Sequence, residues 1–211
     1  MISLLRHRLL SCLRCGRFFN AGMVLQKALS EATNCPSCRQ RKLWFSATLA
    51  LGPYRGELRE AVLRSKRSSE EPFTLALGSL IGQKLGPLLS TQKIDLVTNT
   101  PTHWKRRWQR GVDSTELLLR GILSQVRLPI GLRILGCRRY TRKQGTLTPA
   151  ERFRNVAHAF RVKKPQQVRG KHVLVVDDVM TSGATLNELA RILQQAGASK
   201  VTNVVLARGQ C

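Results

Sequence analysis

Apolar segments with two different periodicities alternate along the chain. Five segments are short, apolar and bounded by turn residues, which is typical of buried strands. They cover residues 45–51, 94–97, 132–137, 173–176 and 201–207. Apolar residues at the three- and four-residue spacing of amphipathic helices predict helices at residues 57–64, 72–85, 114–126 and 186–195, and a short helix that begins at residue 149. Gly86-Pro87 predicts the end of the second helix.

The strand at residues 173–176 runs into a turn that carries polar chemistry. It ends in two carboxylates, Asp177 and Asp178, and the small, hydroxyl-rich residues 181–185 then open the next helix. Backbone N–H groups at a helix N-terminus attract phosphate, and two neighbouring carboxylates accept hydrogen bonds from two ribose hydroxyls. An ordinary strand–turn–helix with a capping Thr or Ser explains single residues of this run but not the whole of it. The run therefore predicts a pocket for a sugar phosphate.

Four of the six cysteines form two C-x2-C pairs that are separated by nineteen residues. These are Cys12, Cys15, Cys35 and Cys38. The spacing is typical of a four-cysteine zinc ribbon, in which a closed tetrahedral shell holds a structural Zn²⁺. Two disulfides or a redox C-x2-C are the alternatives, and a reducing compartment disfavours the disulfides. We expect residues 1–45 to form an N-terminal helix and this ribbon, and residues 46–211 to form the main domain.

The charge of the chain is strongly positive and unevenly distributed. The formal net charge is +24, and residues 101–171 contain 18 Lys and Arg against three Asp and Glu. Cations that neutralise phosphates release counterions, so nucleic acid is the expected partner, with a solvated basic surface as the alternative. The sequence has no apolar run of the roughly 18 residues that a membrane span needs. Arg6 and Arg8 interrupt the apolar start, so we expect an amphipathic helix at residues 1–10 and a cytoplasmic protein.

The segment 98–113 begins as a strand end and continues at once into a group of cations. Such a loop suits pyrophosphate or a nucleic-acid backbone. The residues expected there are Thr102, Arg106, Arg107 and Arg110. Trp104 and Trp108 are four residues apart and share one helical face. They either pack in the core or stack on bases, and we favour packing.

A second basic segment covers residues 138–148 and is long and rich in turn residues. Its cations are further expected contacts for nucleic acid: Arg138, Arg139, Arg142 and Lys143. Its exit predicts the start of a helix, with Thr148 as N-cap, Pro149 at the first position and Glu151 completing a capping box.

Taken in order, these motifs resemble the ComF family of competence-associated phosphoribosyltransferase-like proteins. The resemblance extends from Cys12 to Arg208. It rests on the four-cysteine pattern, Tyr54-Arg55-Gly56 with Lys66, the arginine-rich segment that ends at Gly111, the segment 144–156 and the run 173–185. It implies an α/β protein of the type I phosphoribosyltransferase fold, with a twisted, mostly parallel sheet flanked by helices, and a small four-cysteine zinc ribbon at the N-terminus. It also implies a role in the uptake and processing of exogenous single-stranded DNA in natural competence, with competence and recombination proteins as partners.

The resemblance further implies that phosphoribosyl pyrophosphate (PRPP), together with Mg²⁺, binds at the carboxyl ends of the strands. Asp177 and Asp178 would hold the 2- and 3-hydroxyls of the ribose. The 5-phosphate would be held by Thr181, Ser182, Gly183, Ala184 and Thr185. The pyrophosphate would face Thr102, Arg106, Arg107 and Lys66.

Three functions are compatible with these motifs, and we favour an enzyme. An enzyme would displace pyrophosphate from C1 of PRPP through an oxocarbenium-like transition state, with Asp177 and Asp178 fixing the sugar and Lys143 as a candidate proton carrier. A non-catalytic module would use the pocket as a sensor or nucleotide-end clamp and would hold single-stranded DNA with its basic segments. A nucleobase phosphoribosyltransferase of salvage is the third function.

The chain departs from the family pattern at two places. Asn99-Thr100-Pro101 stands where the family usually has Pro-Val-Pro, and Gly111-Val112-Asp113 stands where it usually has Gly-Phe-Asn. Both places lie near the expected pyrophosphate loop, so we expect the geometry of that loop to differ from the family's.

Overall fold

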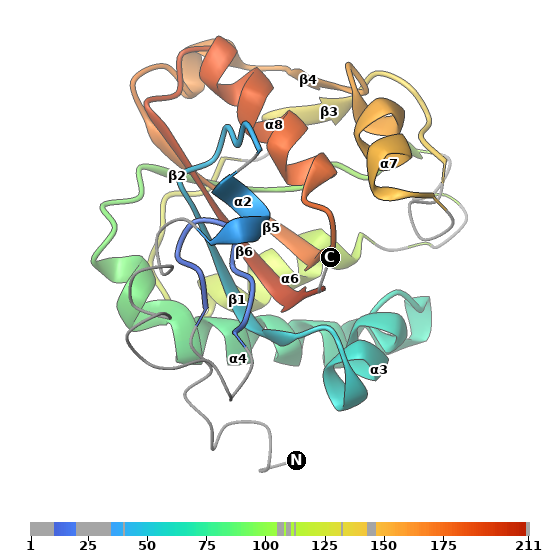
Figure 1. The fold of residues 1–211 in the computed structure, drawn as a ribbon. Coiled ribbons are helices and arrows are strands. Elements are labelled where there is room, and N and C mark those ends of the chain that lie inside the picture. Colours follow the sequence, from blue (N-terminus) through green and yellow to red (C-terminus); the bar gives the residue numbers. More distant parts are fainter. Residues whose placement is uncertain are drawn as a thin grey trace.

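Four parallel strands form the central sheet of the protein (Figure 1). A computed structural model describes residues 11–19, 35–39, 41–104, 108, 111, 113–131, 133–142 and 147–209, so the helix expected at residues 1–10 lies outside the described residues. The strands lie in the order β1 (Ala47–Pro53), β6 (Lys200–Arg208), β5 (His172–Met180) and β2 (Leu96–Asn99). All three pairings are parallel, so the carboxyl ends of the strands meet at one edge of the sheet. The expected α/β architecture with a mostly parallel sheet is confirmed.

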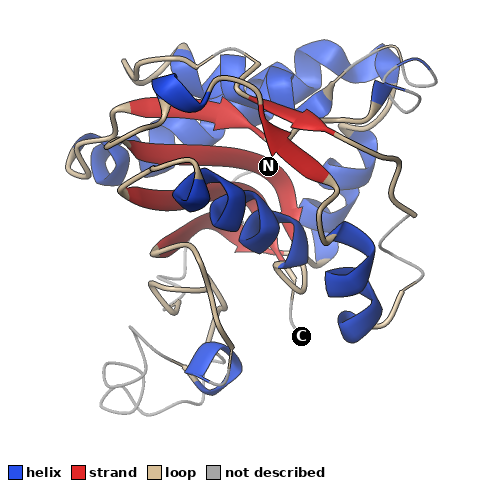
Figure 2. Cartoon of the chain, turned by 90° about the horizontal axis from the view of Figure 1, so that it is seen from above, coloured by secondary structure: helices blue, strands red, loops and turns tan. Residues whose placement is uncertain are grey.

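Helices cover both faces of this sheet (Figures 1 and 2). One face carries α8 (Ala184–Gln195), with α7 (Pro149–Val156) beside it; the other carries α3 (Gly56–Arg64), α4 (Glu71–Ser90) and α6 (Ser114–Leu123). The central strand β5 serves both cores, because Val173 and Val175 pack on the α8 side and Leu174 and Val176 pack on the α4 side. A strand buried on both faces needs apolar residues at every position, which explains its uninterrupted apolar run.

Glycines allow α4 and α6 to approach closely. A Cβ atom on Gly78 would lie 2.3 Å from the carbonyl oxygen of Leu118, and one on Gly121 would lie 2.2 Å from the carbonyl oxygen of Leu75. Both distances are far below van der Waals contact, so only glycine fits at these two positions. The glycine in this stretch of α4 therefore permits helix packing at the cost of a weaker helix propensity.

Two elements differ from the sequence prediction. First, α4 continues through Gly86-Pro87 to Ser90, where the sequence predicts a stop. Pro87 lies in the last turn, where it removes a single backbone hydrogen bond, and the extra turn brings Leu89 into the core with no exposed surface. Second, the strand expected at residues 132–137 is β3 (Leu135–Cys137), which pairs antiparallel with β4 (Phe160–Val162) and lies outside the central sheet.

Short elements complete the described part of the chain. They are α2 (Pro36–Arg39) and the 3₁₀ turns η2 (Ser68–Glu70) and η4 (Pro165–Gln167). Within the described ranges, none of the helices has the length and apolar character that a membrane crossing requires.

Candidate functional site

The two adjacent carboxylates lie near the carboxyl end of β5, between β6 and β2. Asp177 is buried and accepts a hydrogen bond from the backbone N–H of Asp178 at 2.9 Å. Asp178 is partly exposed, and its Oδ2 lies 2.9 Å from Nζ of Lys66, the residue two positions beyond α3. The structure thus brings three of the predicted site residues into one group.

The electrostatics of this group follow from its burial. Desolvation by burial, reinforced by the charge of Asp178, raises the pKa of Asp177 well above its usual value. Burial disfavours the charge of Lys66, but the carboxylates of Asp178 and Asp177 outweigh it and raise the pKa of the Lys66 ammonium. The pair of acids therefore needs a cation close by, and Lys66 supplies one.

The predicted phosphate turn follows β5 and begins α8. Gly183 is the N-cap of α8 and has a φ of +81°, a left-handed conformation that favours glycine. Ser182, Gly183 and Ala184 are buried, and the hydroxyl oxygen of Ser182 accepts from the N–H of Ala184 at 3.3 Å. The positive end of the α8 dipole makes this place suited to an anion.

Two arginines that the sequence analysis did not select contact the turn. Arg152, in α7, donates from Nη1 to Oγ1 of Thr181 at 2.9 Å. Arg41, which follows the fourth cysteine, donates from Nη1 to the carbonyl oxygen of Ser182 at 3.4 Å. Both contacts join segments that are far apart in the sequence, so no local pattern marks these residues.

The remaining predicted cations fall into two groups. Arg106, Arg107, Arg110 and Lys143 lie outside the described residues. The described part of the second basic segment is fastened to α7: Arg139 donates to the carbonyl oxygens of Asn155 and Ala157, and the backbone of Arg142 pairs with the side chain of Asn155. Arg139 thus lies at the C-terminal end of α7, where its positive charge complements the negative end of the helix dipole. Arg139 therefore has a structural role. Arg138 and Arg142 are exposed.

Thr102 and the two departures from the family pattern lie at or after the end of β2, the neighbour of β5. Thr102 is half-buried in the loop after that strand. The side chain of Asn99 donates to Oγ1 of Thr115 at 3.0 Å, and Oγ1 of Thr115 lies 2.7 Å from Oδ1 of Asp113. Asp113 in turn caps the N-terminus of α6. The two departures thus meet at one hydroxyl and form a single polar junction between β2 and α6.

The predicted packing of Trp104 and Trp108 in the core is wrong. Their exposed fractions are 66% and 85%. The ring of His103 lies 5.6 Å from that of Trp104 and meets the ring of Tyr140 edge-on at 5.4 Å. The loop after β2 and the second basic segment therefore share a solvent-facing group of aromatic rings.

The four predicted metal ligands come together in one buried cluster. The Sγ atoms of Cys12, Cys15, Cys35 and Cys38 all lie within 4.8 Å of one another. The Cys12–Cys38 and Cys15–Cys35 sulfur distances are 3.8 and 3.5 Å, well beyond the roughly 2.05 Å of a disulfide. Burial raises the pKa of the Cys38 thiol to about 12, and binding of a metal ion to such thiols releases their protons. This donor set is compatible with a structural metal site.

A buried arginine joins the cysteine cluster to the phosphate turn. Arg208, at the end of β6, is 4% exposed, and its Nε donates to the carbonyl oxygen of Cys15 at 2.8 Å. Its Nη1 donates to the carbonyl oxygens of Met180, at 2.9 Å, and of Thr181. One guanidinium therefore connects both predicted sites.

Comparison with known proteins agrees with this architecture. Residues 116–211, which include both carboxylates and the turn, match the family model described as "Phosphoribosyl transferase domain". The fold is thus the type I phosphoribosyltransferase fold, and residues 116–211 are similar to the phosphoribosyltransferase domain family.

Curated relatives indicate which group of phosphoribosyltransferase-domain proteins this chain resembles. The DNA utilization protein YhgH of Escherichia coli (strain K12) is 28% identical over 177 residues, which cover 82% of this chain and 77% of that protein. Competence protein F of Haemophilus influenzae is 24% identical over 181 residues, which cover 84% of this chain and 79% of that protein. These relatives and the domain match confirm the predicted resemblance to the ComF family of phosphoribosyltransferase-domain proteins.

One solved structure with similarity to the chain is glutamine PRPP amidotransferase from B. subtilis, complexed with ADP and GMP. It is 25% identical, with a TM-score of 0.42, and the match covers 63% of this chain. The match spans 25% of the length of that enzyme.

Proposed function

We propose that the protein binds PRPP, or a related phosphoribosyl ligand, and acts as a phosphoribosyltransferase in the uptake or processing of exogenous single-stranded DNA in the cytoplasm. The observation that carries the proposal is the grouping of Asp177, Asp178 and Lys66 with the turn 181–185 at the carboxyl end of β5. Relatives named for DNA utilization and competence support the setting of the reaction.

In the proposed complex, each part of PRPP is assigned to a different group of residues. The ribose hydroxyls would donate to Asp177 and Asp178, and the 5-phosphate would bind the N–H groups at the start of α8, with Arg152 and Arg41 nearby. Mg²⁺ would enter with the substrate and would supply positive charge beside Asp177 and Asp178. Lys66, which pairs with Asp178 in the free protein, would then be able to turn to the pyrophosphate.

The reaction would break the bond between C1 and the pyrophosphate oxygen, and the pyrophosphate would leave with the electron pair. An acceptor nucleophile would form the new bond to C1 and release its proton. Lys66 stabilises the charge that develops on the leaving group, which lowers the barrier more than it stabilises the ground state. Lys143, the candidate proton carrier, lies outside the described residues.

A non-catalytic DNA-binding module is the second candidate, and the exposed aromatic rings favour it. Trp104, Trp108 and Tyr140 are all at least 45% exposed and lie in or beside segments rich in arginine. Aromatic faces next to cations bind single strands by stacking, with little dependence on base sequence. The pocket would then act as a sensor or as a clamp for a nucleotide end.

The metal at the cysteine cluster is proposed to be Zn²⁺ with a structural role. Four sulfur donors fill a tetrahedral shell and leave no position for substrate. The four cysteines would hold the ion, and it would fix the short segments 11–19 and 35–39 against the main domain.

The test compares one double variant across two ligands. Asp177→Asn with Asp178→Asn removes the negative charge that holds the sugar and Mg²⁺, so we expect PRPP affinity to fall by about two orders of magnitude, as for the loss of two charge-assisted hydrogen bonds. Binding of an oligodeoxythymidylate at moderate salt should change less than twofold, because its contacts lie in the basic segments. Calorimetry measures the first and fluorescence anisotropy the second.

The matched control is Glu57→Gln with Glu60→Gln on α3, which removes two exposed charges and should leave both affinities unchanged. Unchanged PRPP affinity in the aspartate variant, or no PRPP binding by the wild type, would overturn the proposed site. Pyrophosphate release from PRPP, measured with a panel of bases and with single-stranded DNA, separates the two candidates. An enzyme releases pyrophosphate when its acceptor is present, and a binding module does not.

A further inference from the structure

A groove adjoins the phosphate turn on the side opposite Lys66. It has a volume of about 510 Å³ and is lined by Arg41, Lys42, Pro149, Ala150, Phe153 and Asn187. Its walls come from three places: the segment after the fourth cysteine, the first turn of α7 and the first turn of α8. In Figure 1, α7 and α8 lie above the end of β5, whereas α3, which leads to Lys66, lies below it.

The groove is built onto the turn by direct hydrogen bonds. Asn187 accepts from the N–H of Trp44 at 2.8 Å and donates to the carbonyl oxygen of Lys42 at 3.2 Å, which fastens the segment 41–44 to α8. On the same wall Arg41 reaches the carbonyl oxygen of Ser182. On the opposite wall Arg152, the neighbour of Phe153, reaches the hydroxyl of Thr181. A phosphate held by the turn would therefore lie between the sugar-binding carboxylates and the groove.

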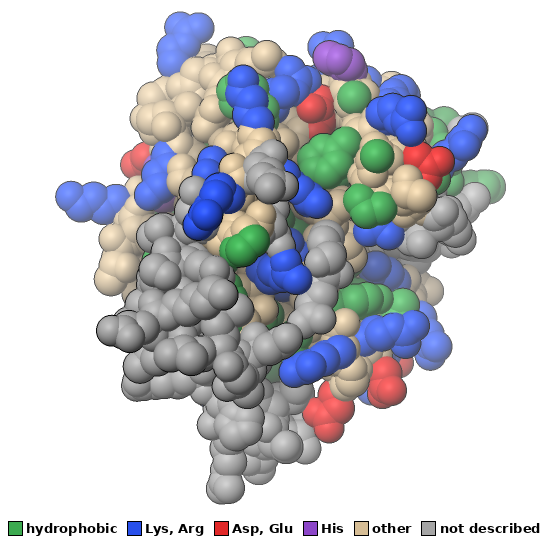
Figure 3. All heavy atoms as spheres, viewed as in Figure 1, with side chains coloured by type: hydrophobic (Ala, Val, Ile, Leu, Met, Phe, Trp, Pro, Cys, Tyr) green, Lys and Arg blue, Asp and Glu red, His purple; other side chains and the backbone are tan. Residues whose placement is uncertain are grey.

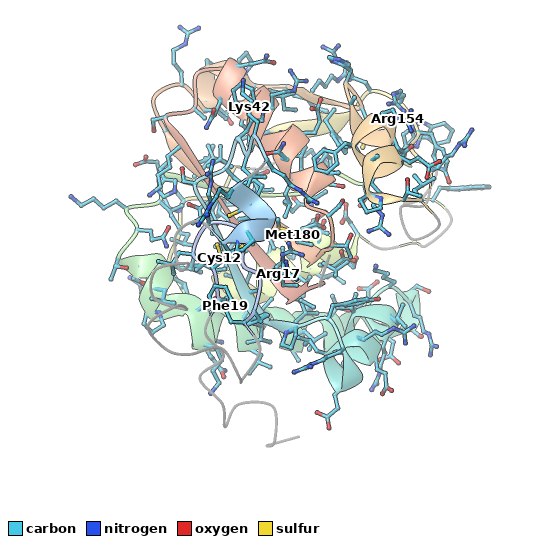
Figure 4. All side chains as sticks on the ribbon, viewed as in Figure 1. Cys12, Arg17, Phe19, Lys42, Arg154 and Met180 are labelled. Atoms are coloured by element: carbon cyan, nitrogen blue, oxygen red, sulfur yellow. The ribbon has the colours of Figure 1, made fainter. Side chains whose placement is uncertain are left out.

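The lining of the groove has the chemistry of a nucleotide subsite. Arg41 and Lys42 are cations, and no acidic residue is among the lining side chains. Phe153 offers a partly exposed aromatic ring, and the volume falls in the range of small-molecule sites. Apolar side chains bordered by Lys and Arg are exposed over α7 and the adjacent part of α8 (Figure 3), and Figure 4 shows Lys42 and Arg154 on either side of this region.

We infer that the site takes a phosphodiester. The ligand is a ribosyl unit at the 3′ end of a nucleic-acid strand, its sugar at Asp177 and Asp178 and its 5′-phosphate in the turn. The groove holds the preceding nucleotide, with its base on Phe153 and its phosphate near Arg41 and Lys42. The inference rests on the proposed function, because it assumes that the sugar and the 5′-phosphate occupy the predicted places. It adds that the 5′-phosphate is esterified to a preceding nucleotide, which occupies the groove.

The probe for the test is a short oligodeoxythymidylate that carries one ribonucleotide at its 3′ end and a fluorophore at its 5′ end. Wild-type protein should bind it at least fivefold more tightly than the same strand with a 3′-phosphate, and PRPP should compete. Lys42→Ala should weaken this binding at least threefold and reduce the slope of log affinity against log salt by about 1, since one phosphate contact is lost. Phe153→Leu should weaken it by a similar factor without changing the slope, because it removes stacking but keeps an apolar side chain.

Binding of PRPP, which has nothing beyond its 5-phosphate, should change less than twofold in both variants. The matched control is Lys84→Ala with Leu88→Ala, an exposed cation and an exposed apolar residue on α4, away from the groove. Thermal unfolding checks that all variants are folded. The inference is overturned if the groove variants bind the strand as well as the wild type does, or if they lose PRPP and the strand equally. Intact PRPP binding without preference for the free 3′ end rejects the inference alone, whereas absent PRPP binding rejects the proposed function and the inference with it.

Discussion

At the scale of single residues, Asp177 shows a conflict between stability and ligand binding. Its carboxyl is buried beside a second carboxyl, and both effects raise its pKa. An acid whose pKa is higher in the folded than in the unfolded state binds more protons when folded. Its favourable contribution to the free energy of unfolding is therefore complete at low pH and is lost as the pH rises through the folded pKa.

Replacement of Asp177 by Asn should consequently stabilise the protein at neutral pH. Asn keeps the oxygen that accepts from the N–H of Asp178 and carries no charge to bury. We expect the melting temperature of Asp177→Asn to exceed that of the wild type by about 2–4 °C at pH 7.5, with the difference vanishing toward pH 4. Circular dichroism melts between pH 4 and pH 8 measure this, with Glu57→Gln as the exposed control. A variant that melts at or below the wild-type temperature at pH 7.5 would contradict the assignment of the buried charge.

The sequence predicted some of the candidate site and missed the rest for a physical reason. Asp177, Asp178 and the turn 181–185 are contiguous, so their chemistry is visible in the order of residues. The resemblance to a family supplied Lys66, which the structure places against Asp178. Arg41, Arg152 and Arg208 act on the turn through contacts that span 141, 29 and 27 positions of the sequence, which periodicity does not reveal.

At the scale of elements, α7 is a short helix whose start was predictable. Thr148 and Glu151 form the expected capping box: the side chain of Thr148 accepts from the N–H of Glu151, and Glu151 accepts from the N–H of Thr148 at 2.8 Å. The same helix presents Arg152 to the phosphate turn and Phe153 to the groove. The cap therefore stabilises a helix that positions two side chains of the site.

Removal of this cap should lower both the stability of the protein and its affinity for PRPP. Thr148→Ala should lower the free energy of unfolding by about 1 kcal/mol, which corresponds to a melting temperature lower by about 2–4 °C. PRPP affinity should fall a few-fold because Arg152 loses its fixed position. Thr148→Ser, which keeps the hydroxyl, is the matched control and should behave like the wild type in melting and calorimetry. Equal affinities in the Ala and Ser variants would show that α7 does not support the turn.

Element boundaries that depend on tertiary packing were less predictable than the capping box. Gly86-Pro87 favours the end of a helix through local backbone preferences. The burial of Leu89 against the sheet outweighs this preference and extends α4 by a turn. The exposed Trp104 and Trp108 illustrate the reverse case. Their spacing is that of a core-facing helix, yet both side chains are largely exposed to solvent.

At the scale of the whole molecule, the two motifs that stood apart in the sequence form one unit. The sequence predicted a cysteine cluster and a phosphate turn, but it did not predict that the side chain of Arg208 joins them. The contact between Arg208 and Cys15 spans 193 positions, and Arg208 is 4% exposed. A cluster of four thiolates around a divalent cation carries net negative charge, which favours a buried arginine beside it.

This coupling predicts that the cluster supports ligand binding without touching the ligand. Arg208→Met, which keeps the length of the side chain but removes its donors, should lower PRPP affinity about tenfold, within the range of typical coupling between sites. Removal of the metal by chelation, or Cys35→Ser, should have a similar effect, and the double change should not be additive. Arg120→Met, at the exposed ion pair with Glu116 on α6, is the control. Calorimetry with PRPP and metal analysis measure the outcome, and full PRPP affinity in Arg208→Met with intact metal content would contradict the coupling.

The order of the strands also bears on how the protein is made. In the described sheet β1 has one partner, β6, and residues that face each other across this pair, such as Thr48 and Asn203, are 155 positions apart. A ribosome that delivers the chain from its N-terminus releases β1 long before β6 exists. Until β6 is synthesised, the backbone of β1 has no hydrogen-bond partner along the edge that β6 will occupy. An unpaired apolar strand of this kind can pair with other chains and aggregate. Synthesis of this protein should therefore depend on protection of its first strand, by a chaperone or by the speed of translation itself.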